Sequence, residues 1–343
     1  MPLAVHVEVN LTGNLGIRRH PDDLGGVVRD PDRDERRVRG LIPLKRLCPF
    51  WIMVSMSSTN STHSPRPSRP RVLSIAGTDP TGGAGAQADL KSIMAAGGYG
   101  MSVVTALVAQ NTQGVRSIHT PPQDFLRDQL DCVFSDVHVD ATKIGMLRDA
   151  TTIRTVRTFL EQHPVPVLVI DPVTIASSGD RLLEPEAEDE LRAFAHFATV
   201  LTPNIPELAL MTETPEATSA EEAVGVAKKW AKETNATVIV KMGHLTGPEA
   251  GNVAVMPDGR THAVQAERVE TKNTHGTGCS LSSALATRLG AGERIDEALE
   301  WTTRWLNAAI RAADDLQVGE GHGPVDHGVW LGSGGAVHDA LKD

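Results

Sequence analysis

The sequence is poor in cysteine, in positive charge and in long apolar runs, and each shortage excludes a class of protein. Three cysteines in 343 residues are too few and too scattered for a disulfide framework or a cysteine-rich zinc site, so we expect a protein of the reducing cytoplasm. The formal net charge of −10 argues against non-specific binding to nucleic acid. The apolar patch at residues 49–54 is far shorter than the ~20 residues that cross a bilayer, and it lacks a clear signal-peptide cleavage site. We therefore expect no membrane partner.

Two common nucleotide-binding motifs are also missing. No G-x-x-x-x-G-K-[ST] loop occurs anywhere in the chain. Residues 83–88 match G-x-G-x-x-A, but no Asp or Glu stands between Asp89 and Asp124 to hold a ribose about 20 positions further on. This disfavours a dinucleotide-dependent dehydrogenase. These glycines are better explained by close approach of the backbone to a small substrate, or by tight packing of a helix on a sheet.

The first 70 residues differ in composition from the rest. They carry more Lys and Arg than Asp and Glu, and residues 57–70 are rich in Ser, Thr and Pro, which is typical of disorder or of a linker. We interpret residues 1–70 either as a disordered N-terminal extension, such as a regulatory tail, or as sequence upstream of a true start at Met53 or Met56. Residues 71–335 are predicted to form the folded domain.

From Arg71 onward, short apolar runs alternate with segments of helical period. Strands are predicted at residues 71–76, 101–109, 141–145, 165–170, 199–201 and 237–241. Helices are predicted at residues 84–96, 124–134, 149–162, 184–197, 220–233, 279–290 and 295–317. Residues 252–255 and 262–264 flank Pro257-Asp258-Gly259 and are predicted to form an antiparallel hairpin at one sheet edge. The alternation predicts an α/β fold, in which helices cover both faces of a mainly parallel sheet.

Polar or sulfur-containing side chains follow most of the predicted strands. They are Asp79, Gln110, Asn111, Lys143, Met146, Asp171, Asn204, Glu207, Lys241 and His244. Because parallel α/β sheets bind ligands at the carboxyl ends of their strands, we expect these residues to share one cleft.

A glycine-rich loop, Gly276-Thr277-Gly278-Cys279, leads into the predicted helix 279–290. Two glycines in three residues permit a tight turn, so that successive backbone N–H groups face one concavity. The N-terminus of the following helix adds unpaired N–H groups and partial positive charge, a combination that binds phosphate. Taken alone, the motif is equally compatible with a simple connection between a strand and a helix.

Several ordered motifs together resemble the hydroxymethylpyrimidine/phosphomethylpyrimidine kinases of thiamine biosynthesis. They are residues 76–85 (AGTDPTGGAG), 87–91 (QADLK), 105–112 (TALVAQNT), 142–147 (TKIGML), 202–207 (TPNIPE), 272–279 (KNTHGTGC) and 321–327 (GHGPVDH). The likeness runs from about Arg71 to about Gly332. It implies a three-layer αβα ribokinase-like fold with a mainly parallel central sheet, and a homodimer. It also implies that ATP phosphorylates a small-molecule substrate, 4-amino-5-hydroxymethyl-2-methylpyrimidine, and then its monophosphate. One departure is Met242, where the family often has glycine.

The chemistry of phosphoryl transfer suggests roles for the glycine-rich loop. The amides of Gly276, Thr277 and Gly278 are expected to stabilise charge on the migrating phosphoryl group. Cys279 stands where the wider superfamily generally carries an aspartate base. A helix N-terminus is expected to lower the pKa of this thiol from its usual ~8.5, so that the thiolate takes the proton of the substrate hydroxyl. The alternative is that Cys279 contributes only its amide and its small size.

The resemblance also implies the nucleotide and metal ligands. Asn204 and Glu207 match the superfamily's Asn-x-x-Glu element, with Asn204 beside ATP and Glu207 holding Mg²⁺ through water. Asp171 is the second metal candidate, or else a turn residue before Pro172. Lys241 neutralises ATP phosphates, unless it is a lysine at the sheet edge whose stem packs on apolar surface.

For the substrate, Gln110 offers both a donor and an acceptor to an aminopyrimidine. The resemblance implies that Gly77, Asp89, Met146 and Val173 line the same pocket, although Asp89 would also suit the surface of its helix. Two competing functions remain: a pyridoxine/pyridoxal kinase, which acts on a similar ring alcohol, and a non-catalytic pyrimidine-binding regulator. The second is disfavoured because Asn204, Glu207 and the glycine-rich loop are all present.

Overall fold

The computed structural model describes residues 8–9, 15–16, 69–176, 179–245 and 249–330. Strands β1 (Glu8–Val9) and β2 (Leu15–Gly16) pair antiparallel in a small sheet of their own. The predicted extension, residues 1–70, lies almost wholly outside the described residues. Its interpretation as a tail or as upstream sequence therefore stays a prediction, and so does the domain range 71–335.

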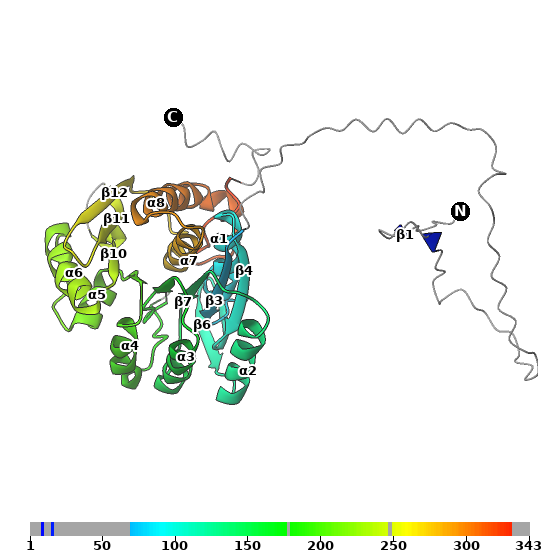
Figure 1. Cartoon of the computed structure of the whole chain (residues 1–343). Helices are drawn as coiled ribbons and strands as arrows, with labels where there is room; N and C mark the ends of the chain where they lie inside the picture. Colours follow the sequence, from blue (N-terminus) through cyan, green and yellow to red (C-terminus); the bar gives the residue numbers. More distant parts are fainter. Residues whose placement is uncertain (1–7, 10–14, 17–68, 177–178, 246–248, 331–343) are drawn as a thin grey trace, which may run out of the picture. The chain divides into compact units, whose positions relative to one another are not determined.

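An eight-stranded sheet forms the centre of the folded domain (Figure 1). Its order is β12-β11-β10-β9-β8-β7-β3-β4. All neighbours from β10 to β4 pair parallel, whereas β11 and β12 form an antiparallel edge hairpin. The strands are β3 (Arg71–Ala76), β4 (Tyr99–Val104), β7 (Ala141–Ile144), β8 (Leu168–Ile170), β9 (Val200–Leu201), β10 (Thr237–Lys241), β11 (Glu249–Val255) and β12 (Thr261–Glu267). The prediction of a mainly parallel sheet with a hairpin at one edge is confirmed.

Helices cover both faces of this sheet and complete three layers (Figure 1). One layer holds α1 (Gly85–Ala95), α7 (Thr277–Gly290) and α8 (Ile295–Arg311). The other holds α2 (Gln123–Phe134), α3 (Ala150–Gln162), α4 (Glu188–Ala195), α5 (Ile205–Thr212) and α6 (Ala220–Thr234). No helix in the described ranges has both the length and the apolar character needed to span a membrane.

Each face of the sheet buries its own apolar core. Leu73, Ile75 and Phe194 belong to the core under α2 to α6, and Leu285 and Trp305 belong to the core under α1, α7 and α8. The central strands are buried on both faces: every residue of β7 and β8 is buried. This explains why they appear in the sequence as continuous apolar runs rather than as alternating ones.

The single strand predicted at residues 101–109 is in fact two strands. β4 ends at Val104, and the chain leaves the central sheet at Thr105, whose side-chain hydroxyl donates to the carbonyl oxygen of Met146 at 2.7 Å. Strand β5 (Leu107–Asn111) then pairs with β6 (Gly114–His119) in a separate antiparallel hairpin, which the sequence analysis missed. The uninterrupted apolar run had concealed the change of sheet.

Two helices and one strand are shorter than the segments predicted for them. The segment 295–317 ends as an α-helix at Arg311 and continues as a 3₁₀ turn, Ala313–Leu316. The segment 184–197 begins with a 3₁₀ turn, Pro185–Ala187, before α4. Strand β8 spans only the last half of the run 165–170.

Candidate active site

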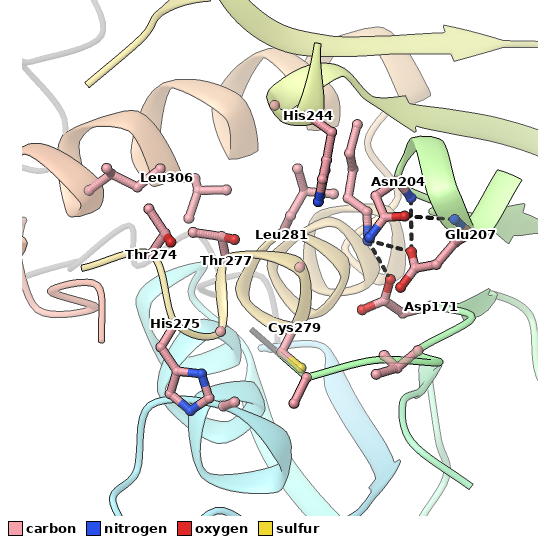
Figure 2. Close-up of a pocket in the computed structure, with 18 of the residues that line it drawn as sticks. Asp171, Asn204, Glu207, His244, Thr274, His275, Thr277, Cys279, Leu281 and Leu306 are labelled. Atoms are coloured by element: carbon pink, nitrogen blue, oxygen red, sulfur yellow. Dashed lines mark hydrogen bonds and ion pairs between the residues drawn. The ribbon is translucent and has the colours of Figure 1, made fainter. Parts of the chain in front are cut away.

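A cavity of about 530 Å³ opens along the carboxyl ends of the parallel strands, where the polar residues were expected to gather. Its lining includes Gln110, Met146, Asp171, Asn204, Glu207, Lys241 and His244, together with the whole glycine-rich loop. Figure 2 shows Asp171, Asn204 and Glu207 grouped on one side of this cavity, away from His275 and close to Cys279. Asp79, Asn111 and Lys143, which were expected in the same cleft, are not part of the lining.

The anion loop, defined as residues 276–279, has the open backbone that a phosphate site needs. Gly276 caps α7 with φ of 78°, a left-handed conformation that favours glycine. The Thr277 N–H donates to the carbonyl oxygen of Thr274 at 3.3 Å, so this amide is partly occupied. Among the described residues, no group accepts a hydrogen bond from the N–H of Gly276, Gly278 or Cys279. These amides and the helix N-terminus are therefore available to an anionic ligand.

A buried contact between Asp79 and His275 holds the anion loop from one side. His275 Nε2 lies 2.8 Å from Asp79 Oδ2, and the same carboxylate accepts from the N–H groups of Gly83 and Ala84. Burial opposes the charge, but hydrogen bonds from His275 and Thr81 hold the pKa of Asp79 well below its usual range. Nothing in the sequence around His275 points to this partner, which lies 196 positions away.

Glycines 83 and 85, which belong to the G-x-G-x-x-A match at residues 83–88, allow the loop between β3 and α1 to make close backbone contacts. A Cβ added to Gly276 would lie 1.8 Å from the carbonyl oxygen of Gly83, and one added to Gly85 would lie 2.4 Å from that of Gly77. Both residues have positive φ. The Gly276 contact shows that the loop between β3 and α1 packs backbone against backbone on the anion loop, and the Gly85 contact holds the β3–α1 loop itself in a tight turn.

Asp171, Lys241 and Glu207 form a buried ionic cluster beside the anion loop. Lys241 Nζ lies 2.8 Å from Asp171 Oδ1 and 3.4 Å from Glu207 Oε2. Asp171 also accepts hydrogen bonds from the hydroxyls of Thr202 at 3.0 Å and Ser282 at 3.2 Å. Burial disfavours the charged form of Lys241, but the two carboxylates outweigh it and raise the pKa of Lys241.

Glu207 is held by the start of its own helix. Its carboxylate accepts from the Asn204 N–H at 2.8 Å, and the Asn204 side chain accepts from the Glu207 N–H at 2.8 Å, which is a capping box for α5. Burial raises the pKa of Glu207 to about 7, and the neighbouring Asp171 charge adds to this, although Lys241 acts in the opposite direction.

The donor set fits a hard divalent cation that keeps most of its own water or phosphate ligands. Asp171 is 1% exposed and Glu207 is 5% exposed, and the two carboxylates share the single ammonium group of Lys241. Across the described ranges, no cluster of three or more His, Cys, Asp or Glu side chains could hold a metal alone. Mg²⁺ is commonly bound in this way, by one or two carboxylates together with phosphate oxygens.

The expected depression of the Cys279 pKa is wrong for this structure. Burial raises the pKa of the Cys279 thiol to about 11, although the nearby Lys143 ammonium acts in the opposite direction. The helix N-terminus does not compensate for desolvation, even though Cys279 is only partly buried and lines the cavity, and the nearby carboxylates of Asp89 and Asp171 disfavour the thiolate further.

The predicted substrate side of the cavity is only partly as expected. Gly77, Gln110, Met146 and Val173 all line the cavity. Gln110 stands at a register shift between β5 and β6, and Met146 contacts the apolar base of that hairpin. A Cβ on Gly77 would lie 2.5 Å from Met146 Cε, so a glycine here makes room for the methionine.

Asp89 does not reach this cavity, which corrects its predicted place in the substrate pocket. The side chain is fully buried under α7 and lies 2.8 Å from Lys143 Nζ, which is fully buried too. The hydroxyls of Ser74 and Ser283 donate to the same carboxylate at 2.6 and 2.7 Å. All its strong acceptor directions are therefore taken inside the protein. It is not a surface carboxylate of its helix either.

Comparison with known proteins places this geometry in a family. The phosphomethylpyrimidine kinase family model matches residues 79–326. The thiamine biosynthesis multifunctional protein ThiED of Corynebacterium efficiens is 60% identical over 262 residues, which are 76% of this chain and 36% of that protein. The chain thus spans about a third of that relative's length.

A shorter relative and a solved structure match over nearly their full length. The hydroxymethylpyrimidine/phosphomethylpyrimidine kinase of Salmonella typhimurium is 44% identical over 260 residues, 76% of this chain and 97% of that protein. The crystal structure of an ADP complex of Bacillus subtilis pyridoxal kinase is 30% identical, with a TM-score of 0.70, covering 76% of this chain and 98% of that chain.

Proposed function

The chain belongs to the phosphomethylpyrimidine kinase family, and from this premise we propose that it phosphorylates 4-amino-5-hydroxymethyl-2-methylpyrimidine and then its monophosphate, with ATP as donor. One observation carries the proposal: Gly276, Gly278 and Cys279, whose backbone N–H groups have no acceptor among the described residues, line the same cavity as Gln110. An anionic phosphoryl group and a flat polar heterocycle therefore find complementary groups within one site.

The mechanism depends on positioning and charge more than on covalent help. The Gly276, Gly278 and Cys279 amides bind the oxygens of the transferred phosphoryl group, where they stabilise the charge that develops during transfer. Lys241 attracts the nucleotide phosphates. Gln110 orients the aminopyrimidine by hydrogen bonds, while Met146 and Val173 offer apolar surface to the ring.

Asp171 and Glu207 are the residues that would hold Mg²⁺, and Asn204 fixes Glu207 through the capping box. Bound there, the cation would neutralise phosphate charge. A phosphate group or cation that approaches this cluster also competes with the present ion pairs of Lys241. Asp171 and Glu207 would thus pair with Lys241 before the ligands bind and would hold Mg²⁺ afterwards.

We propose Cys279 as the general base, and its raised pKa makes that role testable. Because the thiolate is scarce at neutral pH when the pKa is about 11, kcat should rise about tenfold per pH unit from pH 7 to 9. Cys279→Asp should flatten this profile, since a carboxylate is already ionised. Cys279→Ala should lower kcat at least ~100-fold, the usual contribution of a base. Steady-state kinetics across this pH range test it. A loss below tenfold in the alanine variant, with the pH slope kept, would assign Cys279 an amide role alone.

The function is tested by an assay that couples ADP formation to a spectroscopic readout. We expect turnover with hydroxymethylpyrimidine and with its monophosphate, with formation of the diphosphate verified by mass spectrometry. Pyridoxal is the comparison substrate, because the similar structure from Bacillus subtilis is named a pyridoxal kinase. Turnover of pyridoxal alone would replace our proposal with that activity. No turnover of any of the three would favour a binding protein.

On the family resemblance we also propose that the enzyme is a cytoplasmic homodimer. Gel filtration with light scattering measures its mass in solution.

A further inference from the structure

The tip of the β5–β6 hairpin is bound to a segment near the C-terminus. Thr112 lies between the two strands and is 6% exposed. Its side-chain oxygen accepts from the N–H of Gly321 at 3.1 Å, and its carbonyl oxygen accepts from the N–H of His322 at 2.8 Å. We call residues 319–324 the strap.

The strap fits closely around Thr112. A Cβ on Gly319 would lie 2.3 Å from Thr112 Oγ1, and one on Gly321 would lie 2.0 Å from the Thr112 carbonyl oxygen. Both distances are shorter than any real van der Waals contact, so the two glycines are what permits this approach. The contact is therefore a specific one and not a chance apposition of loops.

The other edge of the strap holds the segment that leads into the anion loop. The carbonyl oxygen of Gly323 accepts from the His275 N–H at 3.0 Å, and the Gly323 N–H donates to Asn273 Oδ1 at 2.9 Å. Next to them, His322 Nδ1 lies 3.1 Å from the carbonyl oxygen of Lys272. The strap thus lies between the hairpin that carries Gln110 and the loop that begins at Gly276.

We propose that Thr112 is a positioning residue which, through the strap, couples pyrimidine binding to nucleotide binding. This inference rests on the proposed function, because it takes Gln110 as a pyrimidine contact and the anion loop as the phosphate site. Gln110 is two residues before Thr112, so a ligand that fixes Gln110 also fixes the hairpin tip. The tip fixes the strap, and the strap fixes the segment 273–275. Binding of the first ligand then orders part of the site that the second ligand needs. The second ligand therefore loses less entropy on binding and binds more tightly, which is positive coupling.

Calorimetric titration of the full chain with AMP-PCP, a non-hydrolysable ATP analogue, measures this coupling. In the wild type we expect hydroxymethylpyrimidine to tighten AMP-PCP binding about fivefold or more, the lower end of ordinary coupling between sites. Thr112→Val keeps the shape and the backbone bond to His322 but removes the side-chain acceptor of the Gly321 N–H, so the ratio of the two affinities should fall. Thr112→Ser keeps the oxygen and should restore the ratio. For turnover, Thr112→Val should lower kcat/KM for the pyrimidine about tenfold, because it leaves the Gly321 N–H unpaired.

Thr155→Val is the matched control. Thr155 is also nearly buried, and its hydroxyl donates to Gln123 Oε1 at 2.8 Å on the far helix layer. It should lower stability by a similar amount and leave the affinity ratio unchanged. The proposal is overturned by a wild-type ratio of 1, by an unchanged ratio in Thr112→Val, or by an equal change in Thr155→Val. Failure of the proposed function would look different, since wild-type enzyme would then not turn over the pyrimidine at all.

Discussion

Replacing Gly276 by alanine is expected to lower kcat at least ~100-fold, the size of loss that follows when a transition-state donor is misplaced by about 1 Å. Gly276 has φ of 78°, and its Cβ would lie 1.8 Å from the backbone oxygen of Gly83. Backbone cannot rotate away as a flexible side chain can, so the two loops must separate. The amides of Gly278 and Cys279 then lose their common direction. Steady-state kinetics with saturating ATP measure the loss.

Gly292→Ala is the control for this experiment. Gly292 also has positive φ, 88°, but a Cβ there would meet nothing within 4 Å. Gly292→Ala should lose about 1–3 kcal/mol of stability from backbone strain and keep its activity, whereas Gly276→Ala adds the backbone clash to the same strain and should lose activity. If Gly276→Ala kept kcat within tenfold of the wild type, the anion loop would not be the phosphate site.

Lys241→Met is expected to lower the free energy of unfolding by about 3–5 kcal/mol, the usual cost of removing one partner from a buried ion pair. Asp171 and Glu207 would be left close together without their shared cation. The sign of the pH dependence follows from Glu207. Its pKa of about 7 in the wild-type fold is already above the usual 4.5, and loss of Lys241 raises it further. The deficit should therefore shrink as the pH falls from 8 to 5.5, because the carboxyl group takes up a proton.

Chemical denaturation at both pH values measures this effect. The double variant Lys241→Met, Glu207→Gln should recover part of the lost stability, since one buried charge is gone. Arg260→Met removes an exposed ion pair with Asp258 and should cost less than about 1 kcal/mol. Equal losses at both pH values would mean that Lys241 acts through packing and not through its charge.

Local patterns were sufficient to predict most of the fold. Strands buried on both faces, such as β7 and β8, appear as continuous apolar runs, and the glycine-rich loop forms the N-cap and first turn of α7, two residues before the predicted start of that helix. The strand ends could be aligned because a parallel sheet puts them on one edge. The hairpin of β5 and β6 was missed because nothing in residues 101–109 marks the point where the chain leaves the sheet.

The site itself could be predicted less completely, because its electrostatics depend on burial and on distant partners. Asp89 was expected in the substrate pocket, yet its helix turns it toward α7 and Lys143, 54 positions later. The Cys279 thiol was expected to be acidified by the helix N-terminus, whereas desolvation has the larger effect. A sequence gives the types of these groups but neither their exposure nor their neighbours.

Two pairs of side chains join the beginning of the domain to its end: Asp79 with His275, 196 positions apart, and Asp89 with Ser283, 194 positions apart. During synthesis on the ribosome, β3 and α1 emerge long before these partners exist. The two aspartates must therefore stay hydrated in the nascent chain until the last helices are translated. Closing such large loops is slow in topologies of high contact order. Because the anion loop packs against the backbone of Gly83, this part of the site can form only after residues 276–279 have been translated.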